Sequence, residues 1–306
     1  MKQHVKIGTR ESELAVWQAS LVKNLLQQNG LSADLVYIKS DGDLDTHTPL
    51  YELGVQGIFT KTLDLALLSG RIDLAVHSMK DVPTQLAKGL VQAAVLKRGS
   101  YKDILVYKNN SHFYEEKYGT ATIATSSIRR IAQWLHRYPN HDMVNLRGNV
   151  NTRLRKIGEQ PWHGAIFAAA GVERIHLRPA ESIDLDWMLP APAQGAIMVV
   201  CRENDEALMD GCSCMNDEST ARCTKIERDF LRTLLGGCST PISALATEVA
   251  GSIIFKGNIC STNGKELMSI EKVFDPLENG GGVYAAKEIL TDPTAHRIIN
   301  VIRNEQ

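Results

Sequence analysis

Chemically active residue types gather in the stretch from Asp73 to Pro83. Residues 74–76 form an apolar run that predicts a short buried strand. Four polar or charged groups follow this run almost directly: His77, Ser78, Lys80 and Asp81. Open α/β sheets place their chemistry just beyond the carboxyl ends of strands, so a carboxylate here is well placed for acid/base work. The alternative interpretation of this segment alone is a polar turn after a core strand.

A second stretch concentrates positive charge. Between Ala124 and Lys156 there are six arginines and one lysine against a single acid, Asp142. Two guanidinium groups ~6 Å apart repel by about 3 kcal/mol at an effective dielectric of ~20, so the simplest explanation is a ligand with several carboxylates or phosphates. Four arginines lie at predicted strand-to-helix turns: Arg129, Arg130, Arg147 and Arg153. The others are expected on solvated faces: Arg137, Arg155 and Lys156.

Arg10 and Ser12 lie where a predicted strand at 5–8 turns into a helix that stops at Gly30. Free backbone N–H groups at a helix N-terminus favour an anion, and Arg10 would add a bidentate donor. The alternative is that Ser12 only caps the helix and Arg10 is a surface charge.

Cys238 follows Gly236 and Gly237 at the end of a helix predicted over 221–235. The glycines allow backbone conformations that present the thiol outward, which indicates a reactive cysteine. The other cysteines form no disulfide framework, and their spacing does not predict a metal site. The aspartates of residues 41–45 lack the spacing of a calcium-binding loop.

Alternating strands and helices over the first 200 residues predict an α/β fold with parallel sheets. Predicted strands cover residues 5–8, 35–38, 74–76, 104–107, 123–127, 144–146 and 196–201, and predicted helices begin near residues 12, 59 and 128. The tail, with strands at 253–260 and 267–274 and helices near 284–290 and 295–303, predicts a small α/β domain.

Composition is that of an ordinary globular protein of two or three domains. The chain has 306 residues, of which 43% are hydrophobic and 23% charged, with a formal net charge of -1. This charge argues against a general nucleic-acid or membrane surface, so neither partner is expected. Residues 1–7 contain no apolar leader segment, and we expect a cytoplasmic protein.

Six segments, in chain order, resemble the porphobilinogen deaminase family, also called hydroxymethylbilane synthases, of tetrapyrrole and heme biosynthesis. Val76–Pro83, which reads VHSMKDVP, is the most specific of them. The others are Thr9–Ser12 with Trp17 and Gln18, Thr125–Arg130, Leu146–Val150 with Thr152 and Arg153, Ala193–Ala196, and Gly236–Cys238 with Pro241 and Ile242.

The resemblance implies a transferase that joins four porphobilinogen molecules head to tail, with loss of ammonia, into the linear tetrapyrrole hydroxymethylbilane. Growth starts on a covalently bound dipyrromethane cofactor. The implied fold has two lobes like those of periplasmic binding proteins around a cleft, and a C-terminal domain that carries the cofactor cysteine. We expect these at 1–99 with 196–216, at 100–195 and at 217–306, in a monomer. The rival interpretation is a two-lobed anion-binding protein without catalysis.

The resemblance also implies roles for individual residues. Asp81 matches the catalytic aspartate and Cys238 the position that carries the cofactor through a thioether. Matches to cofactor-binding positions are Ser78, Lys80, Thr125, Ser127, Arg129, Arg130, Arg147 and Gly148. Matches to substrate-binding positions are Arg10, Ser12, Phe59, Arg153, Arg174 and Gln194. Glu52 and Gln56 depart from the family pattern, since lysines are common at both positions.

Overall fold

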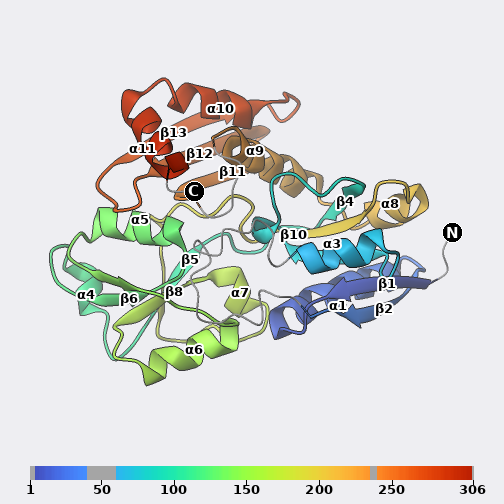
Figure 1. The fold of residues 1–306 in the computed structure, drawn as a ribbon, viewed down its shortest axis with the longest axis horizontal. Coiled ribbons are helices and arrows are strands. Elements are labelled where there is room, and N and C mark those ends of the chain that lie inside the picture. The colour runs from blue at the N-terminus through green and yellow to red at the C-terminus, as the bar shows by residue number, and fades with distance from the viewer. Residues whose placement is uncertain (1–3, 40–59, 235–239, 305–306) are drawn as a thin grey trace.

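The computed structural model describes residues 4–39, 60–234 and 240–304, which are arranged around three β-sheets (Figure 1). The first and second sheets each belong to a lobe with helices, and the third belongs to the C-terminal part of the chain. In Figure 1 the first lobe is mainly blue, with β4 in teal and β10 and α8 in yellow, the second lobe is mainly green, and the C-terminal part is orange to red. No helix in the described ranges is both long and apolar enough to cross a membrane.

The sheet of the first lobe has five strands in the order β2-β1-β3-β10-β4. Their bounds are His4–Thr9 (β1), Ser32–Tyr37 (β2), Leu74–Ser78 (β3), Leu90–Val95 (β4) and Ile197–Arg202 (β10). Helices α1 (Glu13–Gln28) and α8 (Glu206–Ser213) pack on one face, and α3 (Lys61–Leu68) packs on the other. Side chains alternate between these faces, so Val76 packs in the α1 core and its neighbour Ala75 in the α3 core.

The sheet of the second lobe also has five strands, in the order β7-β6-β8-β5-β9. Their bounds are Asp103–Tyr107 (β5), Thr122–Ala124 (β6), Asp142–Val144 (β7), Gly164–Ala168 (β8) and Ser182–Asp184 (β9). The helices of this lobe are α4 (His112–Glu115), α5 (Ile128–Arg137), α6 (Val150–Glu159) and α7 (Ala169–Glu173). Trp134 of α5 is fully buried against Leu105 and Ile123 of the sheet, which fixes the helix on that face.

The C-terminal part is an antiparallel sheet of three strands covered by helices. The strands are β11 (Ile242–Val249), β12 (Ser252–Cys260) and β13 (Leu267–Phe274), and the helices are α9 (Glu218–Leu234), α10 (Gly281–Ile289) and α11 (Pro293–Asn304). Phe230 of α9 and Phe255 of β12 meet edge to face at 5.1 Å between ring centroids in this core.

A buried ion pair joins these parts. Glu227 of α9 is fully buried and accepts hydrogen bonds from both terminal nitrogens of Arg98, at 2.6 and 3.0 Å. The same carboxylate accepts the backbone N–H groups of Ala193, in the crossing that leads back from the second lobe, and of Ala246 in β11. The four bonds satisfy a charge that would be costly to bury alone, and they lock α9 to the region between the lobes.

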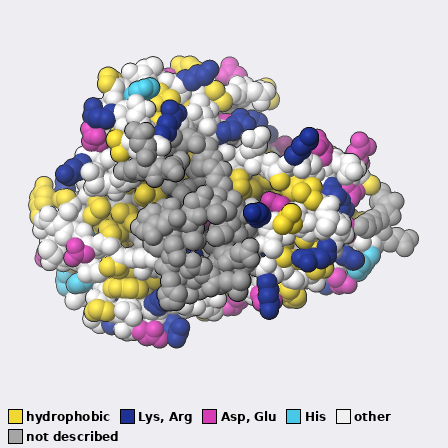
Figure 2. Space-filling view, in the orientation of Figure 1, with side chains coloured by type: hydrophobic (Ala, Val, Ile, Leu, Met, Phe, Trp, Pro, Cys, Tyr) yellow, Lys and Arg dark blue, Asp and Glu magenta, His cyan; other side chains and the backbone are white. Residues whose placement is uncertain are grey.

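The predicted α/β chain of two sheet-based lobes and a small C-terminal domain is confirmed. The predicted parallel pairing is confirmed for β1 with β2 and β3, and for β6 with β7 and β8. Both sheets as a whole are mixed, because β10 runs antiparallel to both β3 and β4, and β5 runs antiparallel to β8 and β9. The chain returns to the first sheet from the second lobe, so β10 enters from the opposite end. Lys/Arg and Asp/Glu side chains are interspersed over the described part of the face seen in Figure 2.

Candidate active site

The site lies where the carboxyl ends of parallel strands from the two lobes face each other. In the first lobe β1 and β3 are parallel neighbours, and they lead to Arg10 and Lys80. In the second lobe β6 is parallel to both β7 and β8. These strands lead to the predicted residues of that lobe: Thr125, Ser127, Arg129, Arg130, Arg147 and Arg174.

Asp81 lies at the end of a single 3-10 turn, Met79–Asp81, directly after β3. The backbone N–H of Met79 donates to Ala196 at 3.0 Å, which ties the start of the turn to the chain entering β10. The side chain of Met79 is buried, whereas Asp81 is exposed. The described residues donate no hydrogen bond to the carboxylate of Asp81.

Lys80 faces the second lobe from the same turn. Its ammonium donates to Oε1 of Gln194 at 3.2 Å, and Nε2 of that amide donates in turn to Asp103 at 2.9 Å. Burial and the charge of Arg130 lower the pKa of Lys80 to about 8, against the opposite effect of Asp81. Lys80 is thus a desolvated cation beside the carboxylate of Asp81, as a site for anionic ligands requires.

Arg129 and Arg130 share one buried carboxylate, that of Asp103. Arg129 donates to Asp103 at 2.6 Å and to the carbonyl of Leu189 at 2.7 Å. Arg130 donates to Asp103 from two nitrogens, at 3.1 and 2.7 Å, and to the carbonyl of Ile166 at 2.9 Å. The sequence analysis missed Asp103. Its only signal there was an acidic residue at the start of a buried strand.

Asp103 reduces the net positive charge of the arginine cluster. Burial would raise the pKa of Asp103, but Arg129 and Arg130 outweigh it and hold this pKa at about 2. One negative charge therefore offsets one of these two guanidinium charges before any ligand binds. The pair still leaves a net positive charge, to which Lys80 and Arg153 add.

We predict that Asp103→Asn lowers the free energy of unfolding by about 3–5 kcal/mol, because it leaves two buried guanidinium groups without their counter-charge. Urea denaturation at neutral pH measures the loss. Since the pKa of Asp103 is lower in the folded state, its contribution is fully present above the unfolded pKa of about 4. This contribution is lost as the pH falls toward about 2. The free energy of unfolding of the variant should therefore fall less steeply over this pH range than that of the unchanged protein.

Asp186→Asn is the matched control. Asp186 pairs with Lys102 at 2.7 Å, but its side chain is 73% exposed, so its loss should cost less than about 1 kcal/mol. Equal losses for the two variants would contradict the role of Asp103.

Arg153 comes from α6, which begins in the loop after β7. Asn149 caps this helix by accepting the backbone N–H of Thr152 at 2.9 Å. Nε of Arg153 donates to the carbonyl of Gly148 at 2.7 Å, which orients the guanidinium. Gly148 has φ +114, a conformation that a residue with a side chain rarely adopts.

The surroundings of Arg153 connect the two lobes. Burial, followed by the charges of Arg130 and Arg147, lowers the pKa of Arg153 to about 10. Asp81 acts in the opposite direction, and Arg10 lowers this pKa further. Arg153 thus lies within electrostatic reach of Asp81 and Arg10 from the first lobe, and of Arg130 and Arg147 from the second.

Arg174 lies at the same interface. Its guanidinium is 5.8 Å from the ring centroid of Trp17 in α1, and it donates to the carbonyl of Gly195 at 2.6 Å. Burial lowers its pKa to about 10. Gly195 has φ +87, and a Cβ there would lie 2.6 Å from the carbonyl of Ser100, so this close approach requires glycine.

The predicted hydroxyl groups lie at the ends of the same elements. Ser78 accepts a hydrogen bond from Gln18 at 2.9 Å. Thr125 is buried and accepts the backbone N–H of Ser127 at 3.3 Å. Ser12 and Ser127 precede α1 and α5, and neither side chain caps its helix, so the hydroxyls are not used for capping.

His77 does not act as an acid at neutral pH. Burial and the charge of Arg10 lower its pKa to about 4, so the imidazole is neutral. Asp81 stays the predicted acid/base group of this segment.

Cys238, Phe59, Glu52 and Gln56 lie outside the described residues. Among the cysteines within them, burial raises the pKa of Cys201 and Cys223 to about 11 and that of Cys212 and Cys260 to about 12. These thiols are protonated at neutral pH and poorly reactive.

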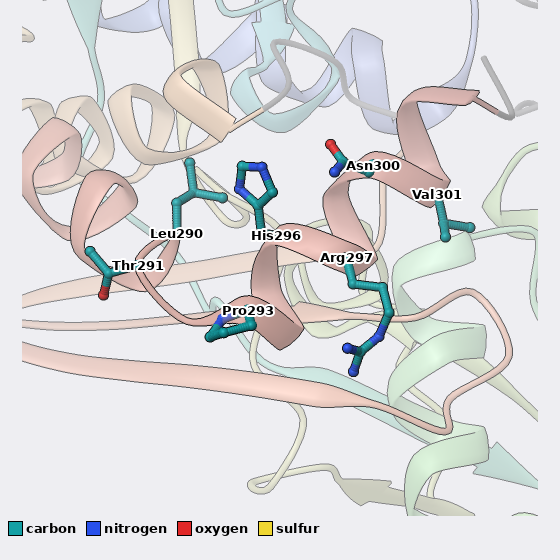
Figure 3. Close-up of a pocket in the computed structure, with 7 residues that line it drawn as sticks. All are labelled: Leu290, Thr291, Pro293, His296, Arg297, Asn300 and Val301. Atoms are coloured by element: carbon teal, nitrogen blue, oxygen red, sulfur yellow. The ribbon is translucent and has the colours of Figure 1, made fainter.

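A surface pocket lies elsewhere, on the C-terminal part (Figure 3). It is lined by residues from the end of α10 and from α11, including His296, Arg297 and Asn300. None of its lining residues was predicted to be functional, and Arg297 is paired with Glu266.

Comparisons with known proteins cover most of the chain. Residues 5–210 match the family model described as porphobilinogen deaminase, dipyromethane cofactor binding domain, and residues 221–288 match that described as porphobilinogen deaminase, C-terminal domain. The chain is 43% identical over 268 residues to porphobilinogen deaminase of Syntrophotalea carbinolica, covering 86% of this chain and 85% of that protein. It is 39% identical over 315 residues to that of Pelotomaculum thermopropionicum, covering 100% and 99%.

A chloroplastic porphobilinogen deaminase of Oryza sativa is 40% identical over 270 residues, covering 85% of this chain and 75% of that protein. Among solved structures, the methionine-binding protein MetQ aligns with a TM-score of 0.43 at 16% identity, covering 69% of this chain and 88% of that chain. The BvgS VFT2 domain of Bordetella pertussis aligns with a TM-score of 0.42 at 14% identity, covering 70% and 87%.

Proposed function

The chain belongs to the porphobilinogen deaminase family and has its activity and its dipyrromethane cofactor-binding domain, and from this premise we propose which residues perform the reaction. Asp81 is the catalytic carboxylate. The observation that carries this assignment is the exposed carboxylate of Asp81 directly after β3, which interacts electrostatically with Lys80 of its own turn and with Arg153 of the second lobe.

The substrate, porphobilinogen, carries an acetate and a propionate on its pyrrole ring. Loss of ammonia from it leaves a cationic azafulvene. The carboxylate of Asp81 stabilises this positive charge, and it accepts the proton released when the new carbon–carbon bond has formed. Arg153 holds a substrate carboxylate and so helps to fix the reacting carbon near Asp81.

The buried cations fit a dipyrromethane with several carboxylates. When bound, this cofactor supplies the terminal pyrrole ring to which the first substrate is joined. We assign its binding to Ser78, Lys80, Thr125, Ser127, Arg129, Arg130, Arg147 and Gly148, and its covalent attachment to Cys238. Arg129 and Arg130 contribute chiefly through their positive field, because Asp103 already occupies much of their donor capacity.

The substrate is bound by Arg10, Ser12, Arg153, Arg174 and Gln194, with Phe59 beside the pyrrole rings. The domains are 1–99 with 196–216, 100–195 and 217–306, and every strand of each sheet falls within one of these domains. The protein is a cytoplasmic monomer.

Arg153→Gln tests the binding assignment. Removing one charge-assisted contact of about 1.5–3 kcal/mol should raise the KM for porphobilinogen by about 10-fold or more. Steady-state formation of hydroxymethylbilane at varied substrate concentration measures this effect.

Arg155→Gln is the control from the same helix. Arg155 is 68% exposed and pairs with Glu159 at 3.4 Å, so its KM should stay within about 2-fold of the unchanged protein. If both variants kept the original KM, Arg153 would not be a substrate ligand.

A further inference from the structure

Arg228 of α9 holds the backbone of the turn that presents Asp81. One terminal nitrogen of its guanidinium donates to the carbonyls of Met79, at 3.2 Å, and Val82, at 2.9 Å. The other donates to the carbonyl of Pro83 at 2.6 Å. The three carbonyls lie on both sides of Asp81 in the chain, so one side chain from the C-terminal part fixes the segment around this carboxylate.

Arg228 belongs to a face of α9 that is turned toward the lobes. Thr220, Glu227 and Arg228 recur at helical spacing, and Thr220 accepts the backbone N–H of Arg98 at 3.1 Å. Glu227 forms the buried pair with the same arginine. Neighbouring residues of α9, such as Phe230 and Leu234, pack in the C-terminal core. The helix therefore contacts both the C-terminal core and the region between the lobes.

The same helix leads directly to the proposed cofactor anchor. It ends at Leu234, and Cys238 is four residues further along the chain. Arg228 precedes Leu234 by six residues, which is about 9 Å of helix. The helix that holds the segment around Asp81 thus ends four residues before the proposed anchor in the chain.

We propose that Arg228 is a positioning residue that sets the carboxylate of Asp81 relative to the cofactor anchored at Cys238. This inference rests on the roles proposed above for Asp81 and Cys238. The planar fork of arginine matches the arrangement, because two nitrogens reach three carbonyls at once. Lysine keeps the charge but offers a single ammonium, and glutamine keeps neither the charge nor the reach.

The experiment compares Arg228→Gln and Arg228→Lys with Arg232→Gln. Arg232 lies one turn further along α9, is 53% exposed and pairs with Asp229 at 2.9 Å. A displacement of about 1 Å at a reacting group can cost 100-fold in rate, so kcat should fall about 10- to 100-fold in Arg228→Gln and less in Arg228→Lys. The KM for porphobilinogen and the cofactor mass should not change. Arg232→Gln should match the unchanged protein.

The same substitution in an Asp81→Glu protein distinguishes a positioning role of Arg228 from a general structural role. In Asp81→Glu the carboxylate already lies one methylene further from the backbone, so Arg228→Gln should lower kcat less there than in the unchanged protein. Equal fold-losses in the two backgrounds, or a raised KM with unchanged kcat, would overturn the inference. If Arg228→Gln does not fold, an unchanged kcat in Arg228→Lys would overturn it instead.

A separate measurement tests the proposed role of Asp81. Near-normal turnover in Asp81→Asn would remove that role whatever Arg228 does. Normal kcat in Arg228→Gln together with an inactive Asp81→Asn would remove only the inference about Arg228.

Discussion

Asp81→Asn is expected to keep its fold and its affinity for porphobilinogen while kcat falls by about 100-fold or more, the usual contribution of a positioned acid/base group. The side chain is exposed, and the described residues donate no hydrogen bond to its carboxylate, so the fold does not depend on its charge. Asparagine has nearly the same size, but it neither accepts the proton nor balances the positive charge of the azafulvene. Ammonia release and hydroxymethylbilane formation measure the effect.

Asp142→Asn provides the control for this prediction. Asp142 is also exposed, and it starts β7 in the second lobe, away from the strand ends that form the site. Its variant should keep kcat within about 2-fold, since isolated surface charges contribute little. Turnover of Asp81→Asn at the level of this control would exclude Asp81 as the catalytic group. A raised KM with unchanged kcat would make Asp81 a binding group instead.

Local sequence patterns predicted most of the elements that position Asp81. The change from an apolar run to polar residues after Val76 marks the end of β3, and periodic leucines mark α1. The position and direction of β10 could not be obtained in this way. β10 lies between β3 and β4 only because the chain returns from the second lobe, and hydrophobic periodicity contains no information about that path. The sequence analysis did not predict β11, although it predicted the neighbouring β12 and β13.

The arginine cluster was predicted from local charge counting, which also explains what was missed. Asp103 is 26 residues before Arg129, outside the window in which the charges were counted. The sequence therefore overstated the positive charge that a ligand must balance. Arg153 was identified correctly as a residue at a strand-to-helix turn, and its approach to Asp81 depends on how the lobes meet.

The contacts of α9 with the lobes could not be predicted from the sequence. Arg228 and Glu227 are adjacent in a polar stretch of helix, and in isolation both resemble surface residues. The carbonyls that Arg228 contacts are 145 or more residues away, and the arginine that pairs with Glu227 is 129 residues away. These contacts join distant parts of the chain, and only the packed structure defines them.

Cys238→Ser is expected to abolish turnover and to remove the cofactor. The intact mass of the unchanged protein under denaturing conditions should exceed the sequence mass by an adduct of two pyrrole units, and the variant should show the sequence mass alone. A serine hydroxyl is a far weaker nucleophile than a thiolate at neutral pH, so the thioether has no equivalent in the variant.

Cys214→Ser is the matched control, because Cys214 is exposed and free, as an anchoring thiol must be. Burial makes the other described cysteines unreactive, so Cys214 is the described thiol that could compete with Cys238 for the cofactor. An adduct that persists in Cys238→Ser and disappears in Cys214→Ser would move the anchor to α8 and its neighbourhood. That outcome would also break the connection through α9 between the anchor and Asp81, so this mass measurement tests the geometry on which the role of Arg228 depends.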